Sequence, residues 1–228
     1  MTSYRFTFAA QTLTALPSGA LHWPAQNLLC VSDLHFGKSA RLARRGGALL
    51  PPYETRATLA RLDADLESTK ATTVICLGDS FDDLHAAQSL DDADHLWLTR
   101  LMAGREWIWL MGNHDPAPFA LGGSHRAEIA RETLTFRHIA SVPATAEVSG
   151  HYHPKARLAG QSRPCFLLDA TRLILPAYGA YTGGLWSDDR ALTTLMQPSA
   201  IAILTGTKAL PIPMPRLQIK PRSANFAR

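Results

Sequence analysis

Residues 73–79 read Thr-Val-Ile-Cys-Leu-Gly-Asp. The uninterrupted apolar run predicts a buried β-strand, and the glycine that follows it places Asp79 just beyond the carboxyl end of that strand. Open α/β sheets carry their chemistry at such strand ends. This stretch therefore predicts an α/β fold with a polar site at one edge of a sheet.

Three further segments supply polar side chains of the same kinds. A largely apolar run at 28–32 leads into Asp-Leu-His at 33–35, and another at 107–111 leads into Gly-Asn-His-Asp at 112–115. Gly-His-Tyr-His follows at 150–153. Together with the carboxylate of the opening stretch, these segments offer carboxylate, amide and imidazole groups from four separate parts of the chain.

This donor set is typical of a site for divalent metal ions. Alternate residues of a strand share one face, so Asp33 and His35 can point at one place, as can His151 and His153. Carboxylate and imidazole ligands without a thiolate suit manganese, iron or zinc. Asp79 can bridge two such ions. Paired ions about 3.5–4 Å apart act on both the attacking and the leaving oxygen of a phosphoryl group.

Each cluster taken alone also has an ordinary structural explanation. Asp-X-His occurs by chance, Gly78 and Asp79 could form a strand-end turn, and Asn113 could cap a helix or a turn. His151 and His153 could be surface histidines. Four such clusters, three of them at strand ends, are hard to obtain by accident, so the combination favours a metal site.

Length and composition are typical of one globular domain. The chain has 228 residues, 46% of them hydrophobic, which is enough for a substantial core. Its three cysteines are odd in number, and Cys30 and Cys76 lie in apolar strands, which favours a reducing cytoplasm. We expect neither a signal peptide nor a membrane span. A net charge of +4 and a pI near 9.1 permit an anionic partner without requiring one.

The remaining pattern predicts an α/β fold in which two mixed β-sheets pack face to face. One helix is expected over residues 53–68, and another from Ser89 to about residue 102. From residue 133 onward short strand-like runs replace the alternation of strand and helix. We therefore expect a β-sandwich flanked by helices, formed by residues 1–210 as a single domain, and a basic, proline-containing tail over residues 211–228.

The polar clusters, in this order, resemble the signature blocks of the calcineurin-like metallophosphoesterase superfamily. The matching blocks are Asp-Leu-His at 33–35, Gly-Asp-Ser-Phe-Asp at 78–82, Gly-Asn-His-Asp at 112–115 and Gly-His-Tyr-His at 150–153. The resemblance implies a metallophosphoesterase-like fold and a centre with two metal ions.

The resemblance also implies a role for each residue of the blocks. One ion would be held by Asp33, His35, Asp79 and His153, and the other by Asp79, Asn113, His151 and one further histidine. His114 would lie beside the leaving oxygen, with Asp115 orienting it.

The further histidine is the ligand that the blocks leave open. His138 ends a predicted strand that begins at Leu134, whereas His125 lies in a glycine-rich loop. We favour His138, because the family presents this ligand at a strand end. The histidines without comparable neighbours are interpreted as surface or packing residues: His22, His85 and His95.

A narrower resemblance covers most of the chain up to about residue 204. Residues 37–41, 45–51, 150–156 and 175–184 look like segments of the bacterial ligase-associated DNA damage response endonucleases. This resemblance implies a cytoplasmic, manganese-dependent phosphodiesterase that acts on single-stranded DNA, with iron, cobalt or zinc as alternative metals. It points to a repair helicase and a ligase as protein partners and leaves a homodimer open.

The substrate is the least determined part of this reading. Lys38 and Arg41 follow the first block closely enough to reach substrate phosphates, or they could form a solvated helix face. The same chemistry would also serve a small nucleotide or a lipid-linked diphosphate. A non-catalytic repair scaffold and a structural zinc site are the remaining alternatives, although structural zinc sites are usually rich in cysteine.

Overall fold

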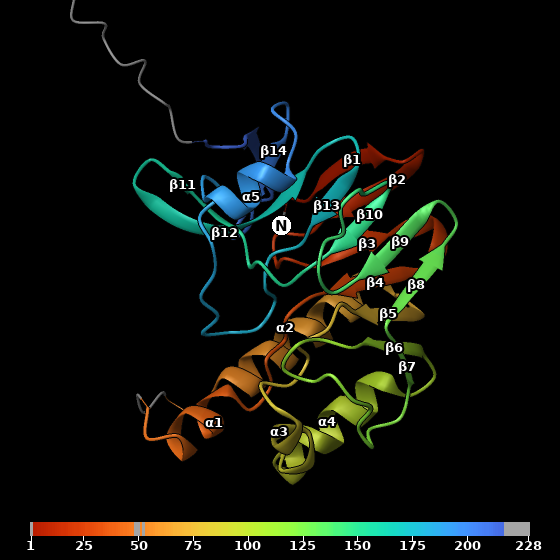
Figure 1. Cartoon of the computed structure of the whole chain (residues 1–228). Helices are drawn as coiled ribbons and strands as arrows, with labels where there is room; N and C mark the ends of the chain where they lie inside the picture. Colours follow the sequence, from red (N-terminus) through yellow and green to blue (C-terminus); the bar gives the residue numbers. More distant parts are fainter. Residues whose placement is uncertain (1, 48–50, 52, 217–228) are drawn as a thin grey trace, which may run out of the picture.

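Two β-sheets pack face to face at the centre of the molecule, and helices cover their outer faces (Figure 1). The computed structural model describes residues 2–47, 51 and 53–216. Within these residues the first sheet has seven strands, in the order β1-β2-β3-β4-β5-β6-β7. Its strands are β1 Tyr4–Phe8, β2 Gln11–Ala15, β3 Leu21–Trp23, β4 Leu28–Val31, β5 Thr73–Cys76, β6 Glu106–Leu110 and β7 Ser124–Arg126.

The second sheet has eight strands in the same described part of the chain. Seven follow the order β15-β14-β12-β13-β10-β9-β8, and β11 pairs with β12 off this path. The central strand β10 is parallel to β9 and β13, and the other pairs are antiparallel. The strands are β8 Glu128–Arg131, β9 Leu134–Arg137, β10 Glu147–Ser149, β11 Lys155–Leu158, β12 Gln161–Leu168, β13 Arg172–Ile174, β14 Ile201–Leu204 and β15 Leu210–Pro213.

The helices lie on both sides of this pair of sheets. Helices α2 to α4 contribute to the core on the outer face of the first sheet, α1 packs against α2 and α3, and α5 packs against the outer face of the second sheet (Figure 1). Their bounds are α1 Lys38–Arg44, α2 Glu54–Thr69, α3 Leu84–Gln88, α4 Asp92–Met102 and α5 Arg190–Leu195, with a short 3-10 turn at Pro24–Gln26. The structure thus confirms the predicted α/β fold of two packed mixed sheets flanked by helices.

Burial on both faces explains why the central strands are apolar throughout. In β4, Leu28 and Cys30 lie in the core between the sheets, whereas Leu29 and Val31 lie in the core beneath the helices. Parallel strands covered on both faces have this continuous apolar character. Every residue of β4 and β5 is buried, so these strands form a rigid base for the loops that follow them.

The strand register brings the polar clusters together. β4, β5 and β6 are parallel, with Val31 opposite Cys76 and Cys76 opposite Trp109. The chain therefore leaves these three strands at one level, and the predicted polar residues follow immediately. The loops are also hydrogen-bonded to each other, because the Asp33 backbone N–H donates to the Gly78 carbonyl at 3.2 Å.

Two predicted boundaries differ from the structure. The helix expected to start at Ser89 is α4, which begins at Asp92 with the Asp91 side chain as its cap, and the short helix α3 precedes it. The tail expected from Pro211 begins inside an edge strand, because β15 pairs with β14. Prolines are tolerated at a sheet edge, where one row of N–H groups needs no partner. Residues 217–228 of the predicted tail lie outside the described residues.

Within the described ranges, no helix is both long and apolar enough to cross a membrane.

Candidate metal centre

The backbone at the predicted ligands is held in a conformation that only the surrounding fold can maintain. Left-handed φ angles occur at five of them: Asp33 (53°), His35 (48°), Asp79 (46°), His151 (71°) and His153 (47°). This region is unfavourable for residues with a side chain, and strained residues of this kind cluster at functional sites. The chain turns at each of these residues, and their side chains meet in the clusters described next.

A first cluster joins ligands that follow β4 with one that follows β10. It contains Asp33, His35 and His153, whose ligand atoms lie within 4.8 Å of one another. Oδ1 of Asp33 is 3.0 Å from Nε2 of His153, and the Nε2 atoms of His35 and His153 are 3.4 Å apart. The other Asp33 oxygen accepts hydrogen bonds from the Ser32 hydroxyl and from the His151 backbone N–H.

A second cluster surrounds Nε2 of His138, the residue that follows β9. This atom is 3.0 Å from Oδ1 of Asn113, 3.3 Å from Nδ1 of His151 and 3.4 Å from Oδ2 of Asp79. Asp79, His138 and His151 form a potential ligand group, and Asp79 belongs with His35 and His114 to a third. Asp79 is therefore the carboxylate that faces both halves of the centre.

The close packing of these loops requires glycine at two positions. Gly78 has a φ of 81°, and a Cβ atom there would lie 2.7 Å from Nδ1 of His138. A Cβ atom on Gly150 would lie 1.7 Å from the Ser32 hydroxyl oxygen. Side chains at these positions would push the ligands of the two sheets apart.

The hydrogen-bonding pattern fits divalent cations. A carbonyl oxygen can only accept, so Nδ1 of His138, 2.7 Å from the Leu77 carbonyl, carries a proton, and in the neutral form of the ring, which is the form that binds a metal ion, Nε2 has a lone pair. That lone pair faces the oxygens of Asn113 and Asp79. Likewise, His35 points Nδ1 at Asp82 and Nε2 toward His153. Lone pairs that converge in this way are satisfied by a cation, and carboxylates that orient imidazoles are common around bound metals.

The charges of the centre are strongly coupled. Burial alone would raise the pKa of Asp33, but its hydrogen bond to His153 and the charges of His153 and His138 lower this pKa to about 2. Burial likewise opposes ionisation of Asp79, and its contacts with His138 and His114 lower its pKa. Burial would lower the pKa of His138, yet Asp79 and Asp33 raise it. The carboxylates are thus held ionised and ready to bind a cation.

Asp82 is a candidate site residue to which the sequence analysis gave no role. It is completely buried, and its Oδ1 lies 2.8 Å from Nδ1 of His35. Burial would raise the pKa of Asp82, but hydrogen bonds from His35 and Arg41 outweigh this and lower it to about 2. Its position as the second carboxylate in Gly-Asp-Ser-Phe-Asp was the available signal.

The structure places Lys38 and Arg41 beside Asp82, the carboxylate that contacts His35. Arg41 donates from Nε to Oδ2 of Asp82, and Nζ of Lys38 lies 4.0 Å from Oδ1 of the same residue. Both cations therefore neutralise the carboxylate behind His35. Their binding of substrate phosphates stays a prediction.

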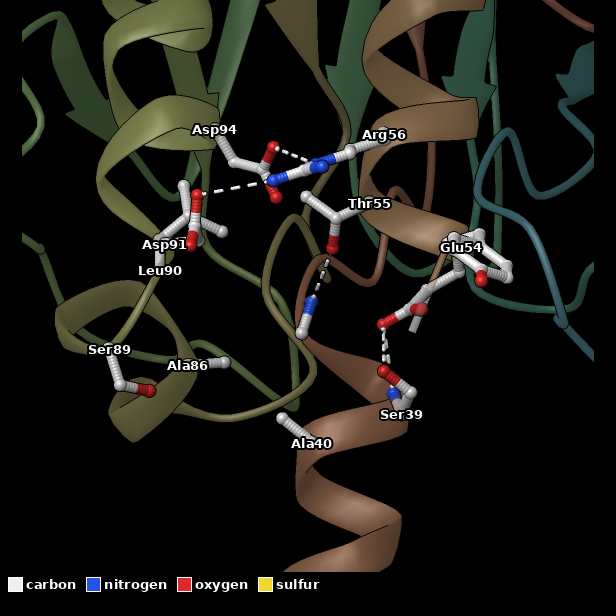
Figure 2. Close-up of a pocket in the computed structure, with 12 residues that line it drawn as sticks. Ser39, Ala40, Glu54, Thr55, Arg56, Ala86, Ser89, Leu90, Asp91 and Asp94 are labelled. Atoms are coloured by element: carbon white, nitrogen blue, oxygen red, sulfur yellow. Dashed lines mark hydrogen bonds and ion pairs between the residues drawn. The ribbon is translucent and has the colours of Figure 1, made fainter. Parts of the chain in front are cut away.

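Helix α1, which carries these cations, is fixed against the start of α2 (Figure 2). The Ser39 N–H and hydroxyl donate to Oε1 of Glu54 at 2.9 and 2.7 Å, and the Gly37 N–H donates to the Thr55 hydroxyl at 3.2 Å. The cavity beside these contacts has a volume of about 370 Å³ and is lined by residues of α1 to α4 and their connections. None of the candidate metal ligands lines this cavity, so we interpret the contacts in Figure 2 as holding α1, and with it Arg41, in place.

His114 lies at the mouth of the centre, and it is oriented by a backbone group. Its Nδ1 is 2.9 Å from the Asp82 carbonyl, so Nδ1 carries a proton and Nε2 faces Oδ2 of Asp79 at 4.0 Å. We had expected Asp115 to orient this ring. Instead, the Asp115 carboxylate accepts four backbone N–H groups, those of Asp79, Ser80, Phe81 and Gly112, at 2.8–3.2 Å. Asp115 thereby joins the loop after β5 to the loop after β6.

The structure separates the two histidines that the sequence left open. His138 lies in the second cluster, as described above, whereas His125 belongs to β7 and packs its ring 4.6 Å from that of Phe119. The strand-end position of His138 was the signal that distinguished it from His125.

Comparison with known proteins agrees with this geometry. The family model of the calcineurin-like phosphoesterases matches residues 27–193. The chain therefore belongs to the calcineurin-like phosphoesterase family and is a metal-dependent phosphoesterase. It is similar to the crystal structure of the Pseudomonas putida nuclease MPE, with a TM-score of 0.72 and 27% sequence identity over 92% of this chain and 100% of that chain. A search among curated proteins found no match.

The arrangement supports phosphoester hydrolysis. Bound divalent ions neutralise phosphate oxygens and lower the pKa of bound water. Asp33, His35 and His153 would hold one ion and Asn113, His138 and His151 the other, with Asp79 shared. His114 lies close to His35 and Asp79, and its imidazolium form, with Nδ1 donating to the Asp82 carbonyl, would give the Nε2 proton to a departing oxygen.

Proposed function

We propose that this chain is a manganese-dependent endonuclease that hydrolyses phosphodiester bonds in single-stranded DNA. The observation that carries the proposal is the pair of Asp and His clusters that share Asp79, with His114 beside them. Two ions held in this way suit an in-line displacement at phosphorus. The similarity to a solved nuclease supports a nucleic acid as the substrate.

Manganese is the metal that we propose on the chemistry of the donors. The centre offers carboxylate oxygen, amide oxygen and imidazole nitrogen as ligands. Manganese prefers these ligands to thiolates. The three cysteines, Cys30, Cys76 and Cys165, are buried elsewhere in the strands. Iron, cobalt and zinc are the alternatives to be compared.

Single-stranded DNA is favoured over duplex by the cost of deformation. The candidate centre is formed by loops at strand ends, so a scissile phosphate must reach into it. A single strand bends easily, whereas bending a duplex costs on the order of 1–6 kcal/mol. We place this activity in DNA repair in the cytoplasm, with a helicase and a ligase as partners and a homodimer as a further proposal.

The proposal is tested with a panel of substrates and metals. Purified protein is incubated with circular single-stranded DNA, the matching duplex, a cyclic nucleotide and a nucleotide diphosphate, each with manganese, iron, cobalt or zinc. We expect linear products from the circular single strand, fastest with manganese. The variant Asp79→Ala, purified in the same way, controls for contaminating nucleases. Preference for the nucleotide diphosphate over every DNA would contradict the nuclease proposal and leave the phosphoesterase chemistry in place.

A further inference from the structure

A cavity beside the candidate centre contains groups that the proposed reaction does not use. Its volume is about 260 Å³, and it is lined in part by His153, Lys155, Ser162 and Thr182. An ammonium group and two hydroxyl groups therefore share a cavity with a candidate metal ligand. These are hydrogen-bond donors suited to phosphate oxygens.

The neighbouring strand adds a second cation on the same face. Lys155 and Arg157 are alternate residues of β11, so their side chains leave the strand on one side. In the antiparallel pairing of β11 with β12, Ser162 lies opposite Arg157. The hairpin thus places two cations and a hydroxyl group along one surface that begins at the cavity.

An aromatic ring, rather than a carboxylate, holds these cations. Nζ of Lys155 lies 4.6 Å and Cζ of Arg157 lies 3.7 Å from the ring centroid of Trp186. Trp186 is fixed because its neighbours exchange backbone hydrogen bonds with Lys155: the Lys155 N–H donates to Leu185, and the Ser187 N–H donates to Lys155. Across the described residues, neither cation forms an ion pair with an acidic side chain.

This arrangement leaves the charge available to an incoming anion. A cation–π contact at an exposed site is weak, so little free energy is lost when a phosphate replaces it. Lys38 and Arg41 differ in this respect, because both contact the buried carboxylate of Asp82. Lys155 and Arg157 are therefore cations beside this cavity whose charge no acidic side chain of the described residues takes up.

We propose that Lys155 and Arg157, together with the cavity lined by Ser162 and Thr182, bind the backbone phosphates of a single nucleic-acid strand next to the scissile phosphate. This inference rests on the proposed function and names the path that the substrate follows. The ammonium and the hydroxyl groups bind the phosphate nearest the centre, and Arg157 binds the following one.

The test compares a polyanionic substrate with a small one. The double variant Lys155→Ala/Arg157→Ala is assayed on a single-stranded oligonucleotide and on bis-p-nitrophenyl phosphate. We expect KM for the oligonucleotide to rise at least tenfold, with activity on the small ester within twofold of wild type. A plot of log affinity for the oligonucleotide against log salt concentration should be less steep for the double variant. The magnitude of its slope should fall by about 1.4, because two phosphate contacts at about 0.7 each are lost.

A matched control and a binding measurement make the result decisive. Lys208, an exposed cation outside this cavity, is replaced in Lys208→Ala, which should leave both substrates unchanged. An unchanged oligonucleotide KM in the double variant, or an equal loss on both substrates, would overturn the inference. If wild type fails to cleave single strands, the proposed function fails. Fluorescence anisotropy of the same oligonucleotide then tests the binding inference separately from cleavage. Weaker binding by the double variant than by wild type supports the inference, and equal binding overturns it.

Discussion

Asp82 connects a candidate metal ligand to the two cations of α1. Its Oδ1 lies beside Nδ1 of His35, and Arg41 and Lys38 neutralise it from the other side. A carboxylate in this position fixes the orientation of the imidazole and makes Nε2 a better ligand. The residue contacts no other candidate ligand through its side chain among the described pairs, so it acts through His35.

Asp82→Asn should weaken metal binding without removing a ligand. The amide keeps the size of the side chain but loses the charge that holds His35 and Arg41. We expect manganese affinity to fall about 10- to 100-fold. Equilibrium dialysis with manganese measures this. Asp83→Asn is the control, because Asn also caps helices well and Asp83 caps α3. Equal affinity in both variants would show that Asp82 does not position His35.

His114→Ala should separate proton transfer from metal binding. We expect the variant to retain its bound metal and to lose about 10²- to 10⁴-fold in kcat on DNA, the usual size of a general-acid contribution. The loss should be much smaller on p-nitrophenyl esters, because p-nitrophenolate needs no proton to leave. Metal analysis and kinetics on both substrates test this. A lost metal ion would show that His114 is a ligand, as its closeness to His35 and Asp79 also permits.

At the scale of elements, the sequence was informative wherever local pattern and burial agree. β4, β5 and β6 were predictable because each is an apolar run followed by a polar cluster. Their convergence follows from parallel pairing alone. The short strand β7 was not predicted, because its pattern of exposure carries little periodicity.

Long-range pairing explains what sequence reasoning could not supply. The ion pair between Arg41 and Asp82 joins residues 41 positions apart, and the local sequence of α1 does not predict it. The proline-containing segment Leu210–Pro213 is a strand, β15, only because it pairs with β14. The contacts of Asp115 with backbone N–H groups are likewise invisible in a sequence, which shows side chains only.

Asp115→Asn should destabilise the two loops that Asp115 joins. The amide has no charge and one acceptor oxygen, so all four N–H groups lose a charged acceptor and two of them lose their acceptor atom altogether. Hydrogen bonds to charged groups contribute about 1.5–3 kcal/mol each, and we expect a loss of roughly 2–4 kcal/mol in the free energy of unfolding. Urea unfolding of the metal-free protein measures it. A change below about 0.5 kcal/mol would contradict this role.

At the scale of the whole molecule, the candidate centre joins the two sheets. Asp33, Asp79 and Asn113 follow strands of the first sheet, whereas His138 and His153 follow strands of the second (Figure 1). Ions bound between them would link the sheets directly. Metal binding should therefore stabilise the folded chain, since a ligand at 100 times its Kd contributes about 2.7 kcal/mol.

This stabilisation should increase with pH. In the metal-free fold the pKa of His138 is raised, so protonated His138 stabilises the metal-free protein. This contribution to the free energy of unfolding is fully present below about pH 6.5 and is lost as pH rises through the raised pKa. Metal binding needs the neutral ring and gains up to about tenfold in affinity per pH unit below that pKa. We expect the difference in Tm between manganese-bound and metal-free protein to be larger at pH 8 than at pH 6. A larger difference at pH 6 would contradict the assignment of His138.

The number of ions bound per chain tests the central claim most directly, namely that loops from both sheets form one dinuclear centre. Manganese is titrated into metal-free wild type, His138→Ala and His125→Ala, and bound metal is counted by elemental analysis after dialysis. The account predicts two ions for wild type and for His125→Ala, and one ion for His138→Ala. A single ion in wild type, or two ions retained by His138→Ala, would contradict it.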